Sequence, residues 1–76
     1  MCLAVPAIVI ELYPDKTALV DILGVNRTVA MDLVPLAQVG DYVLVHAGFA
    51  IEIVSIEAAE ETLQLLREFP ELAGEF

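Results

Sequence analysis

Turn-forming residues divide the first three quarters of this 76-residue chain into short apolar runs, and this spacing limits the possible folds more than any other feature. The runs are rich in valine and isoleucine, which favour strands. Five strands are therefore predicted, over residues 3–13, 17–23, 27–31, 42–47 and 49–56. Short strands at such close spacing are typical of a small closed or nearly closed barrel, because closure removes exposed strand edges.

Three short segments are predicted to turn the chain between these strands. Residues 14–16 begin with a proline that presets one backbone dihedral. Residues 24–26 connect the second and third strands, which are expected to form a hairpin. Gly48 separates the last two strands, and residues 32–39 form a longer connection. Pro6 fits an edge or the beginning of the first strand, where a missing N–H costs least.

The spacing of the apolar residues changes after Ile56. Ala59, Leu63 and Leu66 follow one another at the spacing of a single helical stripe. Glutamates near the start of this segment and Arg67 near its finish complement the helix dipole. These features predict a helix that packs one face against the barrel.

The helix is predicted to stop near Phe69, because the following Pro70 disfavours helical geometry in the residue before it. The chain is therefore expected to be one mainly β domain. A five-stranded barrel occupies residues 1–56, a C-terminal helix residues 57–69 and a loose tail residues 70–76.

Hydrophobic residues make up 59% of the chain, against roughly 45–50% in ordinary domains. A domain this small cannot bury all of that surface. We expect a contiguous exposed apolar patch that contacts another protein. The alternative is a rich core with apolar side chains scattered singly over the surface.

The formal net charge is −9, from 12 acidic and three basic residues. Such a charge repels phosphate backbones and anionic lipids, so it argues against nucleic-acid binding and against binding to a membrane surface. Seven of the acids lie from Glu52 onward, against one base, Arg67. This acidic third either faces a basic partner surface or is simply solvated.

No apolar run reaches the roughly 18 residues that a membrane-spanning helix needs, and no signal peptide is visible. A single cysteine also excludes an intramolecular disulfide framework. We expect a protein of a reducing compartment, the cytoplasm.

The one cysteine is Cys2, directly behind the initiator methionine. Removal of Met1 would place an α-ammonium group beside the thiol, which favours the thiolate. Sulfur and nitrogen could then chelate a soft metal. The alternative is that a cysteine at this position is incidental.

His46 is the one histidine. In a strand over residues 42–47 it shares a face with Tyr42 and Leu44, and Gly48 follows it where backbone can approach a ligand closely. The alternative is a half-buried imidazole bonded to a carbonyl group. Cys2 and His46 cannot complete a four-ligand zinc site, but they can supply two ligands of a site that a partner or cargo completes.

Motifs of hydrolytic enzymes are missing from the sequence: it contains no HExxH, no glycine-rich phosphate loop and no serine nucleophile motif. A cysteine–histidine dyad is formally possible, but a nucleophile so close to a chain end is poorly positioned.

Two stretches, MCLAVP at residues 1–6 and GDYVLVHAGFAI at residues 40–51, together with EAAEETLQLL after them, resemble the HypC/HupF family of small [NiFe]-hydrogenase maturation chaperones. The resemblance extends to about Phe69. The chain departs from the family pattern at Ala7, where glycine is common, and at Ile8, often a polar or basic position.

The resemblance implies an OB-like barrel with a C-terminal helix that is not itself an enzyme. It implies that the protein joins a HypD-type maturation protein, holds iron bearing cyanide and carbon monoxide, and delivers it to the precursor of the [NiFe]-hydrogenase large subunit. It assigns the metal ligands to Cys2 and His46. Partner binding is expected at Cys2, Leu3, Ala4, Val5, Pro6, Gly48 and Phe49.

Two further functions remain as alternatives. In the first, the protein is a metal-free scaffold of the maturation complex, and Cys2 only contacts a partner. In the second, the barrel binds nucleic acid, although the charge and the lack of interleaved basic and aromatic residues argue against it.

Overall fold

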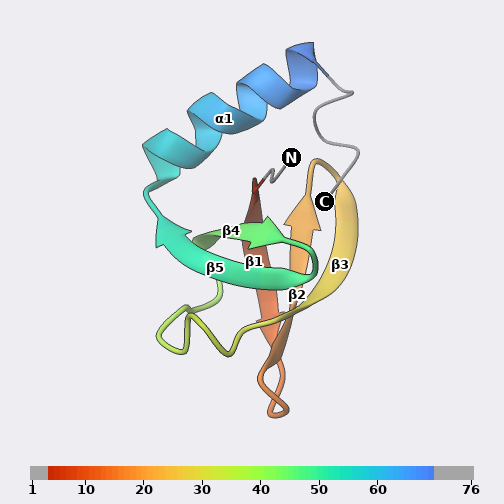
Figure 1. Ribbon diagram of the computed structural model, residues 1–76, viewed down its shortest axis with the longest axis vertical. Helices are drawn as coiled ribbons and strands as arrows, with labels where there is room; N and C mark the ends of the chain where they lie inside the picture. The colour runs from red at the N-terminus through yellow and green to blue at the C-terminus, as the bar shows by residue number, and fades with distance from the viewer. Residues whose placement is uncertain (1–3, 70–76) are drawn as a thin grey trace.

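The computed structural model describes residues 4–69. Five strands precede one helix along the chain (Figure 1). Their bounds are β1 (Val5–Leu12), β2 (Thr17–Ile22), β3 (Val25–Ala30), β4 (Tyr42–His46), β5 (Phe49–Val54) and α1 (Ile56–Glu68). The prediction of a mainly β fold with one C-terminal helix is confirmed.

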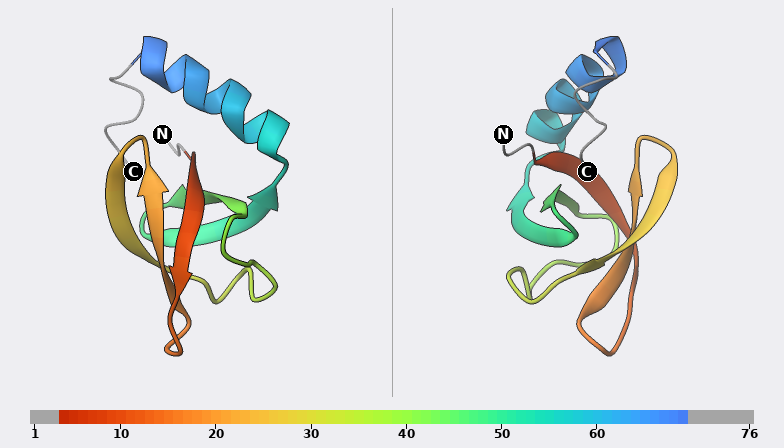
Figure 2. Two further views of the ribbon diagram at one scale, coloured as in Figure 1. Left: turned by 180° about the vertical axis from the view of Figure 1, so that it is seen from behind. Right: turned by 45° about the vertical axis from the view of Figure 1, so that its right-hand side comes forward.

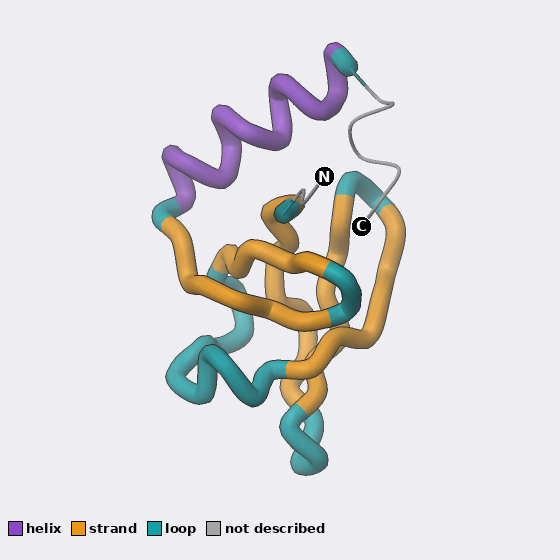
Figure 3. The backbone as a smooth tube through the Cα atoms, in the orientation of Figure 1, coloured by secondary structure: helices purple, strands orange, loops and turns teal. Residues whose placement is uncertain are grey.

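The strands close into a barrel in the order β1-β2-β3-β5-β4, with β4 returning to β1. Neighbouring strands are antiparallel except β3 and β5, which run parallel and meet where Ala30 pairs with Phe49. The tube in Figure 3 shows the strands curling around a common axis. This order and the parallel contact give the closed barrel predicted from the strand spacing, with the OB-like form that the family resemblance implied.

β1 closes the barrel because it pairs with β4 on one side and with β2 on the other. Its first residues, from Val5 to Ile8, pair with β4, and its later residues pair with β2. The register with β2 shifts between Val9 and Glu11, a bulge that lets the strand bend from one neighbour to the other. Pro6 lies in the part of β1 paired with β4 alone, as expected for a residue without an N–H near a strand's beginning.

The core is formed by the inward-facing side chains of the strands. In β2 and β4 these side chains alternate with more exposed ones, as period-two patterning requires. Fully buried side chains come from four of the strands: Val5, Ala7, Val9, Ala18, Val20, Ile22, Val43, Val45 and Ala50.

The connection between β3 and β4 closes one end of the barrel. Met31, Val34 and Ala37 are buried at intervals of three, and the N–H groups of Val34 and Ala37 each donate to the carbonyl three residues earlier. The residues between them point outward, and Leu36 is 83% exposed. Exposed apolar side chains therefore occur on this connection as well as on the strands.

α1 lies across the opposite end of the barrel (Figure 2). Its buried residues are Ala59, Leu63 and Leu66, which confirms the predicted stripe. The helix begins at Ile56, one residue before the predicted start, because the Ser55 side chain accepts a hydrogen bond from the Ala58 N–H at 3.1 Å.

Both short hairpins differ from the predicted boundaries. The turn between β2 and β3 is Leu23–Gly24, with φ of 52° and 88°, and not residues 24–26. Ala47, predicted to end a strand, forms the next two-residue turn with Gly48, at φ of 52° and 85°. Turns with positive φ at both central residues match the twist of the flanking strands, so the chain forms them even where only one of the two residues is glycine.

Candidate functional site

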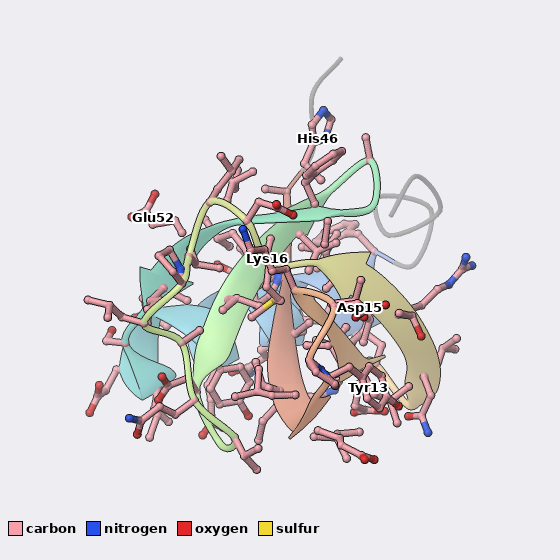
Figure 4. The ribbon with its side chains drawn as sticks, turned by 90° about the horizontal axis from the view of Figure 1, so that it is seen from below. Tyr13, Asp15, Lys16, His46 and Glu52 are labelled. Atoms are coloured by element: carbon pink, nitrogen blue, oxygen red, sulfur yellow. The ribbon has the colours of Figure 1, made fainter. Side chains whose placement is uncertain are left out.

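His46 is the last residue of β4 and pairs with Phe49, the first residue of β5, across the two-residue turn. Register places its side chain on the outer face of the barrel, since its neighbour Val45 points into the core. The imidazole is half-buried. Figure 4 shows it projecting away from the body of the barrel at the end of the hairpin, apart from Glu52.

The two-residue turn that contains Gly48 sets the position of His46 at the end of the hairpin. Gly48 has a φ of 85°, a region that a residue with a Cβ rarely adopts, and a Cβ built there would meet no atom within 4 Å. The space beside the turn is open, and the backbone there is accessible from outside.

The beginning of β1 lies next to His46. Val5 pairs with Val45 in the antiparallel ladder, so the first described residues of the chain lie beside the end of β4. Two segments separated by about 40 residues in sequence are thus brought together, as the expected site requires. Cys2 and Leu3 lie outside the described residues, and the assignment of Cys2 as a ligand stays a prediction.

The described members of the expected partner-binding set differ in exposure. Val5 and Pro6 are buried, and they anchor β1 to β4. Ala4 is half-buried, whereas the side chain of Phe49 is 48% exposed beside His46. Phe49 therefore offers the largest apolar contact next to the imidazole, and its role in partner binding stays a prediction.

Within residues 4–69, no group of three or more histidine, cysteine, aspartate or glutamate side chains could hold a metal ion. The His46 imidazole can in principle bind a metal ion, and an ion bound there would need further ligands from residue 2, from a partner or from the cargo. The assignment of His46 as a metal ligand stays a prediction.

Two surface grooves were not anticipated from the sequence. One, of about 350 Å³, lies between α1 and the barrel and is lined in part by Tyr42, Leu63 and Arg67. The other, of about 260 Å³, lies beside the β1–β2 turn, near Lys16. Neither includes His46. Only the packing of distant elements creates them, so no local sequence signal could have revealed them.

The helix α1 is too short and too polar to cross a lipid bilayer, and the residues described here contain no other helix.

Comparison with known proteins gives a consistent family match. The profile of the HupF/HypC family matches residues 1–66. The chain is 48% identical over 68 residues to the hydrogenase maturation factor HypC of Cupriavidus necator, a match that covers 90% of this chain and 76% of the relative.

The matches to two further relatives extend over almost the whole length of each relative. The hydrogenase maturation factor HypC of Rhizobium leguminosarum bv. viciae is 48% identical over 68 residues, which are 90% of this chain and 91% of the relative. The hydrogenase maturation factor HybG of Escherichia coli K12 is 36% identical over 74 residues, with 90% of each chain covered.

Proposed function

The chain belongs to the HupF/HypC family of hydrogenase maturation chaperones, and we propose that it carries iron during the maturation of a [NiFe]-hydrogenase. In this proposal the cargo is an iron atom bearing cyanide and carbon monoxide. Together with a HypD-type maturation protein, the protein binds this iron atom and passes it to the precursor of the large subunit. The chain acts as a carrier and not as a catalyst.

The observation that supports the proposal most directly is the pairing of Val5 with Val45. Opposed Cα atoms in an antiparallel ladder are about 5 Å apart, and His46 is one residue further along β4. Cys2 precedes Val5 by three residues, which span at most about 10 Å. The single thiol and the single imidazole of the chain are therefore within reach of one ion.

Thiolate and imidazole are suitable ligands for an iron atom whose other positions are filled by diatomic ligands. Both donor atoms must be deprotonated to bind. Two protein ligands at the surface leave the remaining positions to the cargo's own ligands and to partners. Such partial coordination allows release, whereas a closed four-ligand site would retain the ion.

Docking of partners next to this site is supported by its apolar surroundings. Phe49, opposite His46 in the ladder, is 48% exposed, and Ile51 in the same strand is 42% exposed. Apolar side chains of this size beside a metal ligand provide contact area for a protein that shares the ion. A thiolate ligand also has to stay reduced, which favours a reducing compartment, the cytoplasm, for this step.

Infrared spectroscopy of the complex between this protein and a HypD-type partner tests the proposal. Cyanide and carbon monoxide bound to iron absorb in a region where protein does not. Wild-type complex should show these bands, and Cys2→Ser and His46→Ala should each shift or weaken them. Glu52→Gln, in the same hairpin as His46 but projecting elsewhere, is the matched control and should leave the bands unchanged.

Bands that are identical in wild type and in both ligand variants would reject the carrier role. The protein would then be a metal-free scaffold, for which the complex forms normally and all iron is held by the partner. Binding of a labelled duplex at low salt would instead indicate a nucleic-acid-binding barrel, which a net charge of −9 disfavours.

A further inference from the structure

The groove between α1 and the barrel follows one row of paired residues. Ile8 of β1 pairs with Asp21 of β2 on one side and with Tyr42 of β4 on the other. These three side chains share the outer face of the barrel, because their neighbours along each strand are buried in the core. All three line the groove, and all three are half-buried. One wall of the groove is therefore set by the register of three strands.

The helix forms the opposite wall. Leu63 and Leu66 line the groove and are buried in the core cluster, against which Leu23 and Tyr42 also pack. Arg67 follows Leu66, lines the same groove and is exposed, so its guanidinium group lies at the mouth. The groove thus has an apolar interior and a charged side chain from each of two elements.

The two charges in the groove have opposite signs and are not neutralised. Asp21 pairs across the sheet with Ile8 and Asn26, and neither carries a charge. The residues three and four positions before Arg67, on the preceding helical turn, are uncharged as well. Among the described residues, neither the carboxylate nor the guanidinium group has a hydrogen-bond or ion-pair partner, although both line one groove.

We propose that this groove binds an apolar α-amino acid. Its ammonium group donates to the Asp21 carboxylate, and its carboxylate accepts from the Arg67 guanidinium group. Its side chain lies against Ile8, Leu63 and Leu66. Hydrogen bonds between charged groups are the strong ones, and guanidinium matches a carboxylate with two parallel donors. The groove has a volume of about 350 Å³, at the small end of the range for ligand sites, as expected for a ligand of this size.

Charge favours a zwitterion over other occupants. The chain has a net charge of −9, so it repels simple anions. An amine without a carboxylate would leave Arg67 unpaired. In a peptide segment of a partner, both end groups of each residue become neutral amides, so Asp21 and Arg67 would both lose their charged partners. A molecule that carries both charges beside an apolar side chain satisfies every wall of the groove.

This site is separate from the proposed iron site, because the groove does not include His46. A bound amino acid would connect Asp21 of β2 with Arg67 of α1 and so hold the helix against the barrel. A ligand that binds only the folded protein also stabilises it. The thermal stability of the protein should therefore rise with the concentration of the amino acid.

Nuclear magnetic resonance titration of the full-length protein with leucine tests the proposal. The amides of Gly24 and Leu63 in the groove should shift and saturate at millimolar leucine, while Thr17 in the other groove should not move. N-acetyl-leucine lacks the ammonium group, leucinamide lacks the carboxylate and glycine lacks the side chain. Each should bind about tenfold more weakly than leucine.

Two results of this titration would overturn the proposal. One is the lack of saturable shifts up to the solubility limit of leucine. The other is equal binding of leucine capped at both ends, which would identify the groove as a site for a peptide segment of another protein.

Two variants test the assigned charges. Asp21→Asn and Arg67→Gln keep the size of the side chain and remove one charge, so each should weaken leucine binding about tenfold. Leucine should raise the unfolding temperature of wild type much more than that of Asp21→Asn. Lys16→Gln, which removes a charge at the other groove, is the matched control and should behave like wild type. Equal leucine affinity in wild type and in both groove variants would contradict the assignment.

The same variants separate this proposal from the iron-carrier role. Asp21→Asn should leave the infrared bands of the iron complex unchanged, because Asp21 and His46 lie on different strands and do not share the groove. Leucine binding should likewise persist in His46→Ala. Loss of leucine binding in His46→Ala would contradict the assignment of the ligand to this groove.

Discussion

Val5 of β1 and Val45 of β4 are directly opposite each other in the barrel, and both are fully buried. Their pairing places the start of β1 beside the end of β4, where His46 projects from the outer face. The buried pair thus works as an anchor, while Ala4 before Val5 and His46 after Val45 are only half-buried. The proposed cargo site would gain from this combination, because the core would place the ligands without enclosing them.

Cys2→Ser is expected to abolish hydrogenase maturation in a host that depends on this protein. The hydroxyl is a poor ligand for iron at neutral pH, whereas the thiolate is a good one. The barrel should unfold at the same temperature as wild type, since the described core starts at Val5. The measurement is hydrogenase activity in cell extract together with thermal unfolding of the purified variant, and normal activity would refute the ligand role.

His46 and Phe49 are paired across the hairpin, but His46→Ala and Phe49→Ala should impair different properties of the protein. Loss of the imidazole should lower iron retention while the affinity for the HypD-type partner stays within about twofold. Loss of the phenyl ring, which is 48% exposed, should weaken partner affinity roughly tenfold or more. Iron content and titration calorimetry on both variants provide the comparison; equal iron content in His46→Ala and wild type would remove His46 from the site.

Gly48→Ala should lower the free energy of unfolding by about 1 kcal/mol, since a residue with a Cβ is strained at positive φ. Gly24→Ala in the other hairpin is its matched control, because both glycines have φ near the same value and open space around the missing Cβ. Both variants should lose similar stability by denaturant titration. Only Gly48→Ala should also alter iron retention, because only that turn adjoins His46.

Ile22→Ala should destabilise the barrel by about 2–5 kcal/mol, because Ile22 is among the largest fully buried side chains and its truncation leaves a cavity. Ile22→Val should cost about 1 kcal/mol. Leu36→Ala, at an 83% exposed position, should change stability by less than about 0.5 kcal/mol. Urea unfolding of the three variants gives the comparison, and a large loss in Leu36→Ala would show that the β3–β4 connection packs against something in solution.

Several parts of the fold could be predicted because they depend on local patterns. Burial alternates along β2 and β4, as the period of two in a strand requires, and the stripe of Ala59, Leu63 and Leu66 in α1 follows from the helical spacing of the sequence. The boundaries of the hairpins were predicted less accurately than these elements. Leu23 and Ala47 give no local sign that they adopt positive φ, and they do so because the paired strands on either side require a two-residue turn.

By itself, the sequence determined that this protein is a small strand-rich domain with one amphipathic helix, one thiol and one imidazole. Which residues become neighbours was decided only by the tertiary structure. Closure of the barrel pairs Val5 with Val45 and brings Ala30 of β3 beside Phe49 of β5. These contacts join segments far apart in the chain, and they form because the whole set of inward side chains can be buried only when all five strands are in register.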